Sequence, residues 1–270
     1  MNQTLVSHVS DTARWVAIYR AWESARADAL FRDPFAARLA GERGAAIAKL
    51  MPLQARSGWP LIVRTKLIDD LILASVAEGC DCVVNLAAGL DTRPYRMALP
   101  ASLRWTEIDH PNVLEEKERV LASERPTCGL WRRAADLTDP AVRATILDEV
   151  TAGSKRTLVI SEGLLIYLDE LMVRALSGDL LSLPHIRWWL LDVASPNLRQ
   201  MMMRAMGAQL ANAPLVFAPP NGVAFFEKGN ESEKTDQARE YQPKENPRAA
   251  ITVFSDLGFH GANATRAPLT

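Results

Sequence analysis

Cysteine is scarce in this sequence, which has three cysteines among 270 residues. Cys80, Cys82 and Cys128 cannot all pair with one another, and the Cys80/Cys82 pair lacks the second pair of ligands that a zinc site would need. We therefore expect reduced thiols, no disulfide framework and no metal site.

Long apolar runs and an excess of one charge are also missing. No segment reaches the roughly 20 apolar residues of a membrane span, and the stretch MNQTLVSHVSDTARW has no basic start followed by an apolar core. The 31 Lys and Arg residues are balanced by 32 Asp and Glu residues, whereas binding to a phosphate backbone needs a concentrated basic surface. We expect a cytoplasmic protein whose partner is a small molecule, without membrane or nucleic acid contact.

What the chain does contain is enough apolar residues, 48%, to bury a large core. Because it has no internal repeat and no Gly/Ser-rich linker, we expect a single domain over residues 1–270. Residues 1–58 are expected to form a helical cap, residues 59–195 a cofactor-binding core, and residues 196–270 an acceptor-side or lid region with the final strands.

Strand and helix patterns alternate through the core. Short apolar runs that suit strands buried on both faces predict strands over 82–87, 103–109, 129–137, 157–163 and 185–194. Helical patterns predict helices over 59–79, from Pro111, over 141–150, over 169–181 and within 195–220, and in the cap a helix that Pro34 opens and Gly41 ends. The polar stretch 228–247 is expected to be a surface lid, and the tail to add a helix turn and a last strand. The alternation predicts an α/β fold with mostly parallel strands and helices on both faces.

The segment CVVNLAAGLDTRPYRMAL joins a predicted strand to a helix opened by Pro94, through a turn with one glycine, Gly89. A dinucleotide fingerprint has three glycines here, but Ala87 and Thr92 occupy the outer two positions. A pyrophosphate ligand is therefore disfavoured. S-adenosylmethionine is a nucleoside ligand without phosphates, and Gly89 would let the backbone approach it closely.

Acids follow two of the predicted strands. Asp109 lies about 20 residues after Gly89, the spacing of an acid that binds ribose hydroxyls, although it could instead cap the helix that Pro111 opens. Asp136 and Leu137 end the next strand, where a carboxylate could accept from the amine of adenine while the leucine frames the ring. A helix cap is an equally good interpretation of Asp136.

Two further charged residues occupy unusual positions. Arg64 falls within the apolar stripe of its predicted helix, so its guanidinium must find an anion, either the carboxylate of the cofactor or a protein acid. Glu162 ends the apolar strand TLVISEG and should face the ligand crevice, where it could hold the ammonium of the cofactor, line the acceptor pocket or pair with an arginine of the cap.

The stretches NLAAGLDTRPYR, TEIDHPNVLEEK, AADLTD and ISEGLLIYLDE, together with SDTARWVAIYRAWESARADALFRDPFAARLAG, resemble the leucine carboxyl methyltransferase-like family and its bacterial branch of S-adenosylmethionine-dependent methyltransferases. The resemblance implies a class I methyltransferase fold, Rossmann-like, and O-methyl transfer. It also implies that the cofactor-binding residues are Arg64, Gly89, Asp109, Asp136, Leu137 and Glu162. One departure from the eukaryotic members is Ala87, where they have the first glycine of NLGAG.

The methyl acceptor is expected to be a carboxylate or hydroxyl of a small molecule. A carboxylate needs no general base, whereas a hydroxyl would need one. The candidates for that base are His110, Tyr167, His185 and His260, and none of them is assigned a catalytic role. An apolar acceptor pocket could be lined by Trp188, Trp189, Met201, Met202, Met203 and Met206, although core packing is the better expectation for each of them taken singly. The alternative functions are a nicotinamide-dependent oxidoreductase and a protein that binds S-adenosylmethionine without catalysis.

Overall fold

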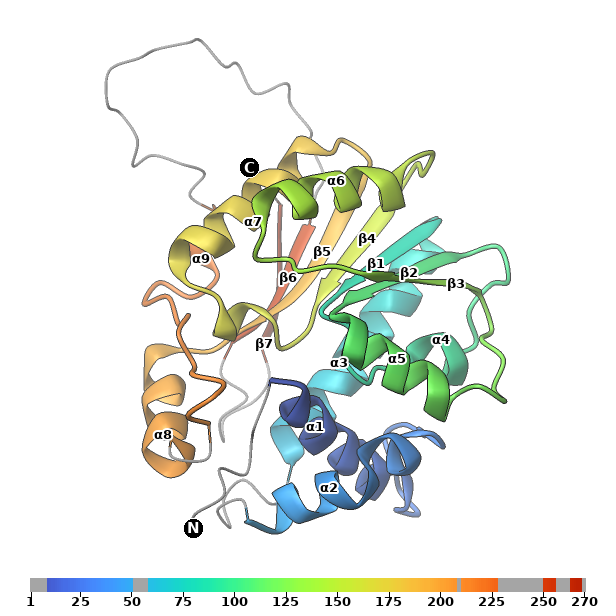
Figure 1. Ribbon diagram of the computed structural model, residues 1–270. Helices are drawn as coiled ribbons and strands as arrows, with labels where there is room; N and C mark the ends of the chain where they lie inside the picture. Colours follow the sequence, from blue (N-terminus) through green and yellow to red (C-terminus); the bar gives the residue numbers. More distant parts are fainter. Residues whose placement is uncertain (1–8, 51–57, 208–209, 228–249, 256–262, 269–270) are drawn as a thin grey trace.

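A seven-stranded sheet with the order β3-β2-β1-β4-β5-β6-β7 forms the centre of the protein, and all neighbouring strands are parallel except β6 and β7 (Figure 1). The computed structural model describes residues 9–50, 58–207, 210–227, 250–255 and 263–268. The strands are β1 (Cys82–Leu86), β2 (Arg104–Asp109), β3 (Gly129–Ala134), β4 (Thr157–Ser161), β5 (Ile186–Val193), β6 (Ala250–Ser255) and β7 (Asn263–Pro268). The helices are α1 (Val9–Ser24), α2 (Ala36–Leu50), α3 (Trp59–Ala77), α4 (Arg93–Arg96), α5 (Pro111–Val120), α6 (Pro140–Thr151), α7 (Glu170–Ser182), α8 (Pro196–Met206) and α9 (Ala224–Glu227), with a 3₁₀ turn, η2 (Leu165–Tyr167).

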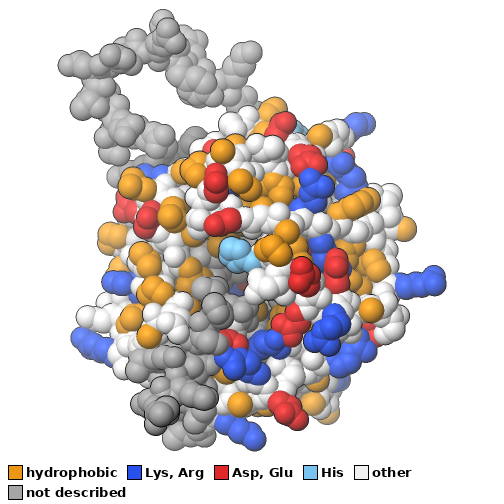
Figure 2. Space-filling model, viewed as in Figure 1, with side chains coloured by type: hydrophobic (Ala, Val, Ile, Leu, Met, Phe, Trp, Pro, Cys, Tyr) orange, Lys and Arg blue, Asp and Glu red, His pale blue; other side chains and the backbone are white. Residues whose placement is uncertain are grey.

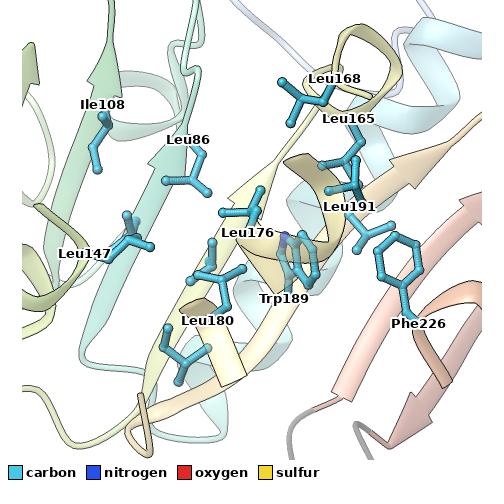
Figure 3. Close-up of a cluster of buried hydrophobic side chains, with 14 of the residues drawn as sticks. Leu86, Ile108, Leu147, Leu165, Leu168, Leu176, Leu180, Trp189, Leu191 and Phe226 are labelled. Carbon is cyan, nitrogen blue, oxygen red and sulfur yellow. The ribbon is translucent and has the colours of Figure 1, made fainter. Parts of the chain in front are cut away.

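Helices cover both faces of the sheet, and the apolar runs of the sequence are buried for that reason. On one face, Leu86 of β1 lies in one cluster with Leu147 of α6 and Leu176 of α7 (Figure 3). On the other face, Val83 of β1 lies in a cluster with Ile72 of α3. All residues of β1 and β4 are buried, as expected for strands covered on both sides. The predicted α/β fold is confirmed.

The cap helices α1 and α2 pack on each other below the sheet edge (Figure 1). Trp15 and Tyr19 of α1 share a buried cluster with Leu39 of α2 and with Leu90, which follows β1. A Cβ atom at Gly58, just before α3, would collide with the ring of Tyr19, and Gly58 also has a φ of 62°. The cap is therefore fitted closely against the start of α3.

Some sequence predictions are met and others differ from the structure. Gly41 ends a helix as predicted, since its backbone is not helical (φ 58°, ψ −170°), but a second helical part of α2 follows directly to residue 50, and its Ile47 and Ala48 are buried. After β5, helix α8 ends at residue 206, and apart from a short turn the rest of 195–220 is not helical where described. The described part of the tail provides two strands where one was expected, and residues 256–262 between them lie outside the described residues. The predicted lid, 228–247, lies outside the described residues.

The surface charges are mixed in sign, and the cysteines are buried. Charged side chains of both signs are intermingled on the face shown in Figure 2. Cys80, Cys82 and Cys128 are free and buried, and burial raises the pKa of Cys80 to about 12 and that of Cys128 to about 11, so both thiols stay protonated near neutral pH. Among the described helices, none is both long and apolar enough to cross a membrane.

Candidate functional site

A cavity of about 1540 Å³ opens at the carboxyl edge of the sheet, where the strand order reverses between β1 and β4. The segments that follow β1, β2 and β4 contribute Gly89, Asp109 and Glu162, and β5 contributes Asp192. Helices α1, α3 and α8 form other walls. In an open α/β sheet, this reversal point is the usual place for a nucleotide-like ligand.

The turn after β1 is tight and left-handed. Ala87 has a φ of 50° and Gly89 a φ of 49°, and a side chain is strained at such values. A Cβ atom on Gly89 would lie 3.3 Å from the Cβ of Ala13 in α1. The glycine is thus required for the approach of the cap as well as for the backbone conformation.

Asp109 lies at the end of β2 and lines the cavity, with 8% of its surface exposed. Its Oδ2 accepts a hydrogen bond from the Gly89 N–H at 2.6 Å, and its Oδ1 accepts one from the His110 N–H at 2.7 Å. Helix α5 begins after His110 without a side-chain cap, so Asp109 is not the helix cap that the sequence left open. Because each carboxylate oxygen has a second lone pair, Asp109 keeps the capacity to accept bonds from a ligand.

Asp136 and Leu137 follow β3 and are not among the described residues that line the cavity, although the next residue, Thr138, is. The Oδ1 of Asp136 accepts from the N–H and Oγ1 of Thr138, at 2.9 and 2.7 Å, and these bonds lower the pKa of this exposed carboxyl group. Asp139 provides the cap of α6. A role for Asp136 and Leu137 at adenine stays a prediction.

Arg64 has protein acids as partners. Its Nε donates to Glu162 at 3.0 Å and its Nη1 donates to Asp192 at 2.7 Å, which is one of the two outcomes that the sequence left open. Its Nη2 makes no hydrogen bond within the described part of the chain, and Arg64 lines the cavity. One edge of the guanidinium is therefore still available to a ligand.

Arg93 binds the acids of three different segments. Its Nη1 donates to Glu162 at 2.7 Å and to Asp91 at 2.8 Å, while its Nε donates to Asp69 of α3 at 2.7 Å. Burial alone would raise the pKa of Glu162, but the charges of Arg93 and Arg64 outweigh it and hold this pKa below its usual value. The carboxylate is consequently ionised and a weak base near neutral pH.

This network extends to the cap. Asp69 also accepts from Arg96 at 2.7 Å, and Asp33 accepts from Arg20 at 2.9 Å and from Thr92 at 2.7 Å. We call the connected ionic groups the charged floor, and they are Arg20, Asp33, Arg64, Asp69, Asp91, Arg93, Arg96, Glu162 and Asp192. It holds four guanidinium groups and five carboxylates. The four arginines line the cavity together with Asp91, Glu162 and Asp192, and Asp109 adds a fourth carboxylate to the lining, so these groups of both signs face a ligand in equal number. The cavity therefore suits a ligand that carries both cationic and anionic groups.

Sequence reasoning identified Arg64 and Glu162 but missed their partners Asp192 and Arg93. A signal existed for Asp192, because it ends the apolar stretch IRWWLLD in the same way as Glu162 ends its own strand. Arg93 carried no such signal, since an arginine at the start of a short helix is ordinary at the surface.

Only some of the residues considered for the lining of an apolar acceptor pocket lie at the cavity. Met201 and Met202 of α8 line the cavity, whereas Met203 packs into the cap cluster. Trp188 and Trp189 are buried in the clusters on opposite faces of the sheet, so for these two residues the expectation of core packing is confirmed and the alternative, that they line the pocket, is not. The physical reason is the alternation of side chains along β5. The side chain of Met206 lies outside what the structure describes.

Two of the candidate bases lie at the cavity. His110 lines it and is exposed. Tyr167 also lines it, and burial raises the pKa of its hydroxyl despite an opposing hydrogen bond with Thr12. His185, just before β5, is not among the described lining residues, and His260 lies outside the described part of the chain.

The fold and the crevice define an α/β protein with a nucleotide-type site at the strand reversal. The chain belongs to the leucine carboxyl methyltransferase family, whose sequence pattern matches residues 13–179. A Mycobacteroides abscessus protein named for S-adenosyl-L-methionine-dependent methyl transfer is 38% identical over 61% of this chain and 58% of its own length. A protein of Mycolicibacterium smegmatis with the same kind of name is 33% identical over 82% of this chain and 81% of its own.

The chain spans less than two thirds of the length of several such relatives, including those of Mycobacteroides abscessus and Streptomyces coelicolor. Among solved structures, a DUF574 family protein of Streptomyces avermitilis superposes with a TM-score of 0.52 over 80% of this chain and 82% of that one, at 15% identity. This likeness concerns the fold alone.

Proposed function

We propose that this protein transfers the methyl group of S-adenosylmethionine to an oxygen of a small molecule, with a carboxylate as the acceptor. The observation that carries the proposal is the charged floor, which presents arginines and carboxylates side by side to the cavity, beside a turn that lacks the glycines of a dinucleotide site. S-adenosylmethionine carries an ammonium and a carboxylate on its amino-acid end and a sulfonium next to it, so it can use groups of both signs. The names of the relatives support the same cofactor.

The residues present fit that cofactor. We assign the ribose hydroxyls to Asp109, whose carboxylate is already oriented by two backbone N–H groups. Glu162 would hold the ammonium, and the free Nη2 edge of Arg64 would hold the cofactor carboxylate. Gly89 gives close approach of the backbone, and the loop with Asp136 and Leu137 would frame the adenine.

A carboxylate is the favoured acceptor because the described cavity offers few bases. Glu162 is ionised but weakly basic, since two arginines lower its pKa, and Tyr167 is protonated because burial raises its pKa. A carboxylate acceptor arrives ionised, so the protein has only to hold the acceptor in line with the sulfonium. Orientation of this kind can supply about 7 to 11 kcal/mol of a barrier. A hydroxyl acceptor would depend on His110.

The test begins with calorimetric titrations of the purified chain with S-adenosylhomocysteine and with NAD. We expect heat only with S-adenosylhomocysteine, and binding of NAD alone would overturn the proposal in favour of an oxidoreductase. Incubation with methyl-labelled cofactor and a panel of carboxylic acids and alcohols then identifies the acceptor class. Label that base treatment releases indicates an ester, and base-stable label indicates an ether. Binding without transfer to any acceptor would leave a cofactor-binding protein without catalysis.

A further inference from the structure

The cavity is larger than the cofactor alone requires. Sites for single small ligands are usually about 300 to 1000 Å³, whereas this cavity measures about 1540 Å³. The charged floor accounts for one side of it. If the proposed function is correct, on which this inference rests, the remaining space belongs to the methyl acceptor.

Helix α8 borders that remaining space. Its N-terminus is capped by Ser195, whose Oγ accepts from the Leu198 N–H at 3.1 Å, and Arg199 anchors the helix by donating to the Leu215 carbonyl at 3.1 Å. Leu198, Met201 and Met202 line the cavity, and we call them the α8 wall. Their spacing of three and four residues places Leu198, Met201 and Met202 along one side of the helix.

The α8 wall includes an exposed apolar side chain. Met201 is 56% exposed, and an apolar stripe that faces a cavity is typical of a binding surface. Trp15 of α1 and Ile166 of η2, which belong to the same apolar cluster as Met202, add apolar surface to the lining. The carbonyl of Ile166 accepts two backbone N–H groups, at 2.7 and 3.1 Å, which fixes its position.

Few charges lie outside the charged floor. Apart from the charged floor and Asp109, the only Asp, Glu, Lys or Arg among the described lining residues is Arg204. Arg204 is exposed and lies about one turn beyond Met201 on α8. Helix α8 also lines the cavity with the amides of Asn197 and Gln200, and the rest of this surface offers an acceptor mainly apolar contacts.

We propose that the methyl acceptor is a carboxylic acid with an elongated, mainly apolar body that lies along the α8 wall, with its carboxylate directed toward the charged floor. In the transfer, a carboxylate oxygen forms a bond to the methyl carbon while the bond from that carbon to sulfur breaks. The electron pair of the broken bond stays on sulfur, which becomes a neutral thioether, and the carboxylate becomes a neutral ester. No proton moves, which agrees with the lack of an assigned base.

The experiment measures binding of butanoate, octanoate and dodecanoate to the full chain saturated with S-adenosylhomocysteine. We expect affinity to rise with chain length, by up to about fourfold for each buried methylene. Met201→Glu should weaken dodecanoate binding by about tenfold or more, since a charge would then face the apolar body, and Met201→Gln should weaken it less. The matched control is Leu171→Glu on α7, an exposed leucine that does not line the cavity, which should bind all acids as the wild type does.

The outcomes separate this inference from the proposed function. Unchanged affinity of the Met201 variants for S-adenosylhomocysteine shows that they fold. An affinity that does not depend on chain length, or equal binding of dodecanoate by Met201→Glu and wild type, overturns the apolar acceptor and leaves the cofactor site standing. Absence of S-adenosylhomocysteine binding by the wild type overturns the proposed function and this inference with it.

Discussion

Replacement of Asp109 by asparagine separates a structural role from a cofactor role at the end of β2. The carboxylate accepts backbone N–H groups from Gly89 and His110 on different oxygens, at 2.6 and 2.7 Å. Asparagine has one carbonyl oxygen, so one of these donors would face an amide NH₂ instead. The unpaired donor should cost about 1 to 3 kcal/mol of the free energy of unfolding.

The substitution should also weaken binding of the cofactor. Hydrogen bonds to a charged group are worth about 1.5 to 3 kcal/mol, so losing the carboxylate at the ribose should weaken binding of S-adenosylhomocysteine by about 10- to 150-fold. Calorimetric titration measures the affinity, and urea unfolding of the same samples measures stability.

A matched control exists at the surface. Asp139 also accepts two backbone N–H groups, from Ala141 at 2.9 Å and Val142 at 3.2 Å, but as the cap of α6. Asp139→Asn should leave stability nearly unchanged, because a single oxygen accepts both N–H groups and asparagine caps a helix about as well as aspartate, and it should leave the affinity unchanged. The ribose assignment is refuted if Asp109→Asn binds S-adenosylhomocysteine as tightly as the wild type, or if Asp139→Asn loses as much affinity.

Three further predictions concern stability. Ala87→Gly should raise the free energy of unfolding by about 0.5 to 1 kcal/mol, because Ala87 has a left-handed φ of 50°, and a lower melting temperature would contradict this. The pKa of Glu162 lies below the usual value of about 4.3, so its stabilisation is complete at neutral pH and is lost as pH falls below about 4.3. Melting curves should show that the difference in stability between wild type and Glu162→Gln shrinks only in that acidic range. A difference that does not change with pH would count against the ion pairs. Lys117→Met should cost about 1 to 3 kcal/mol in urea unfolding, since the fully buried Glu107 loses the Lys117 ammonium at 2.6 Å but keeps Arg132 at 2.8 Å, and a loss under about 1 kcal/mol would show that the pair contributes little.

The strands and the helix starts could be predicted because neighbouring residues encode them. The runs that form β1, β4 and β5 are mostly apolar, since helices cover both faces of the sheet. Asp169 and Ser195 cap the helices that follow them, as local hydrogen bonds that a short stretch of sequence specifies. The same local reasoning placed Asp109 and Glu162 at strand ends, hence at one edge of a parallel sheet.

Distant packing decided what local reasoning left open. Gly41 ends a helix as its sequence context predicts, but the chain resumes a helix at once because Ile47 has a place in the cap cluster, and no pattern around the glycine reveals that cluster. The adjacent tryptophans Trp188 and Trp189 looked alike in the sequence, but strand alternation sends them to opposite faces of the sheet.

The sequence by itself therefore determined the order of strands and helices, the glycine turn and the acids at the strand ends, because each depends on interactions within a few residues. Only the tertiary structure decided how the charges pair. Arg64 meets Glu162 and Asp192 across 98 and 128 positions of the chain, and Arg93 meets Glu162 across 69. Such pairs form because a buried guanidinium must find a carboxylate wherever the fold brings one within reach, and that choice depends on the packing of the whole sheet and its cap.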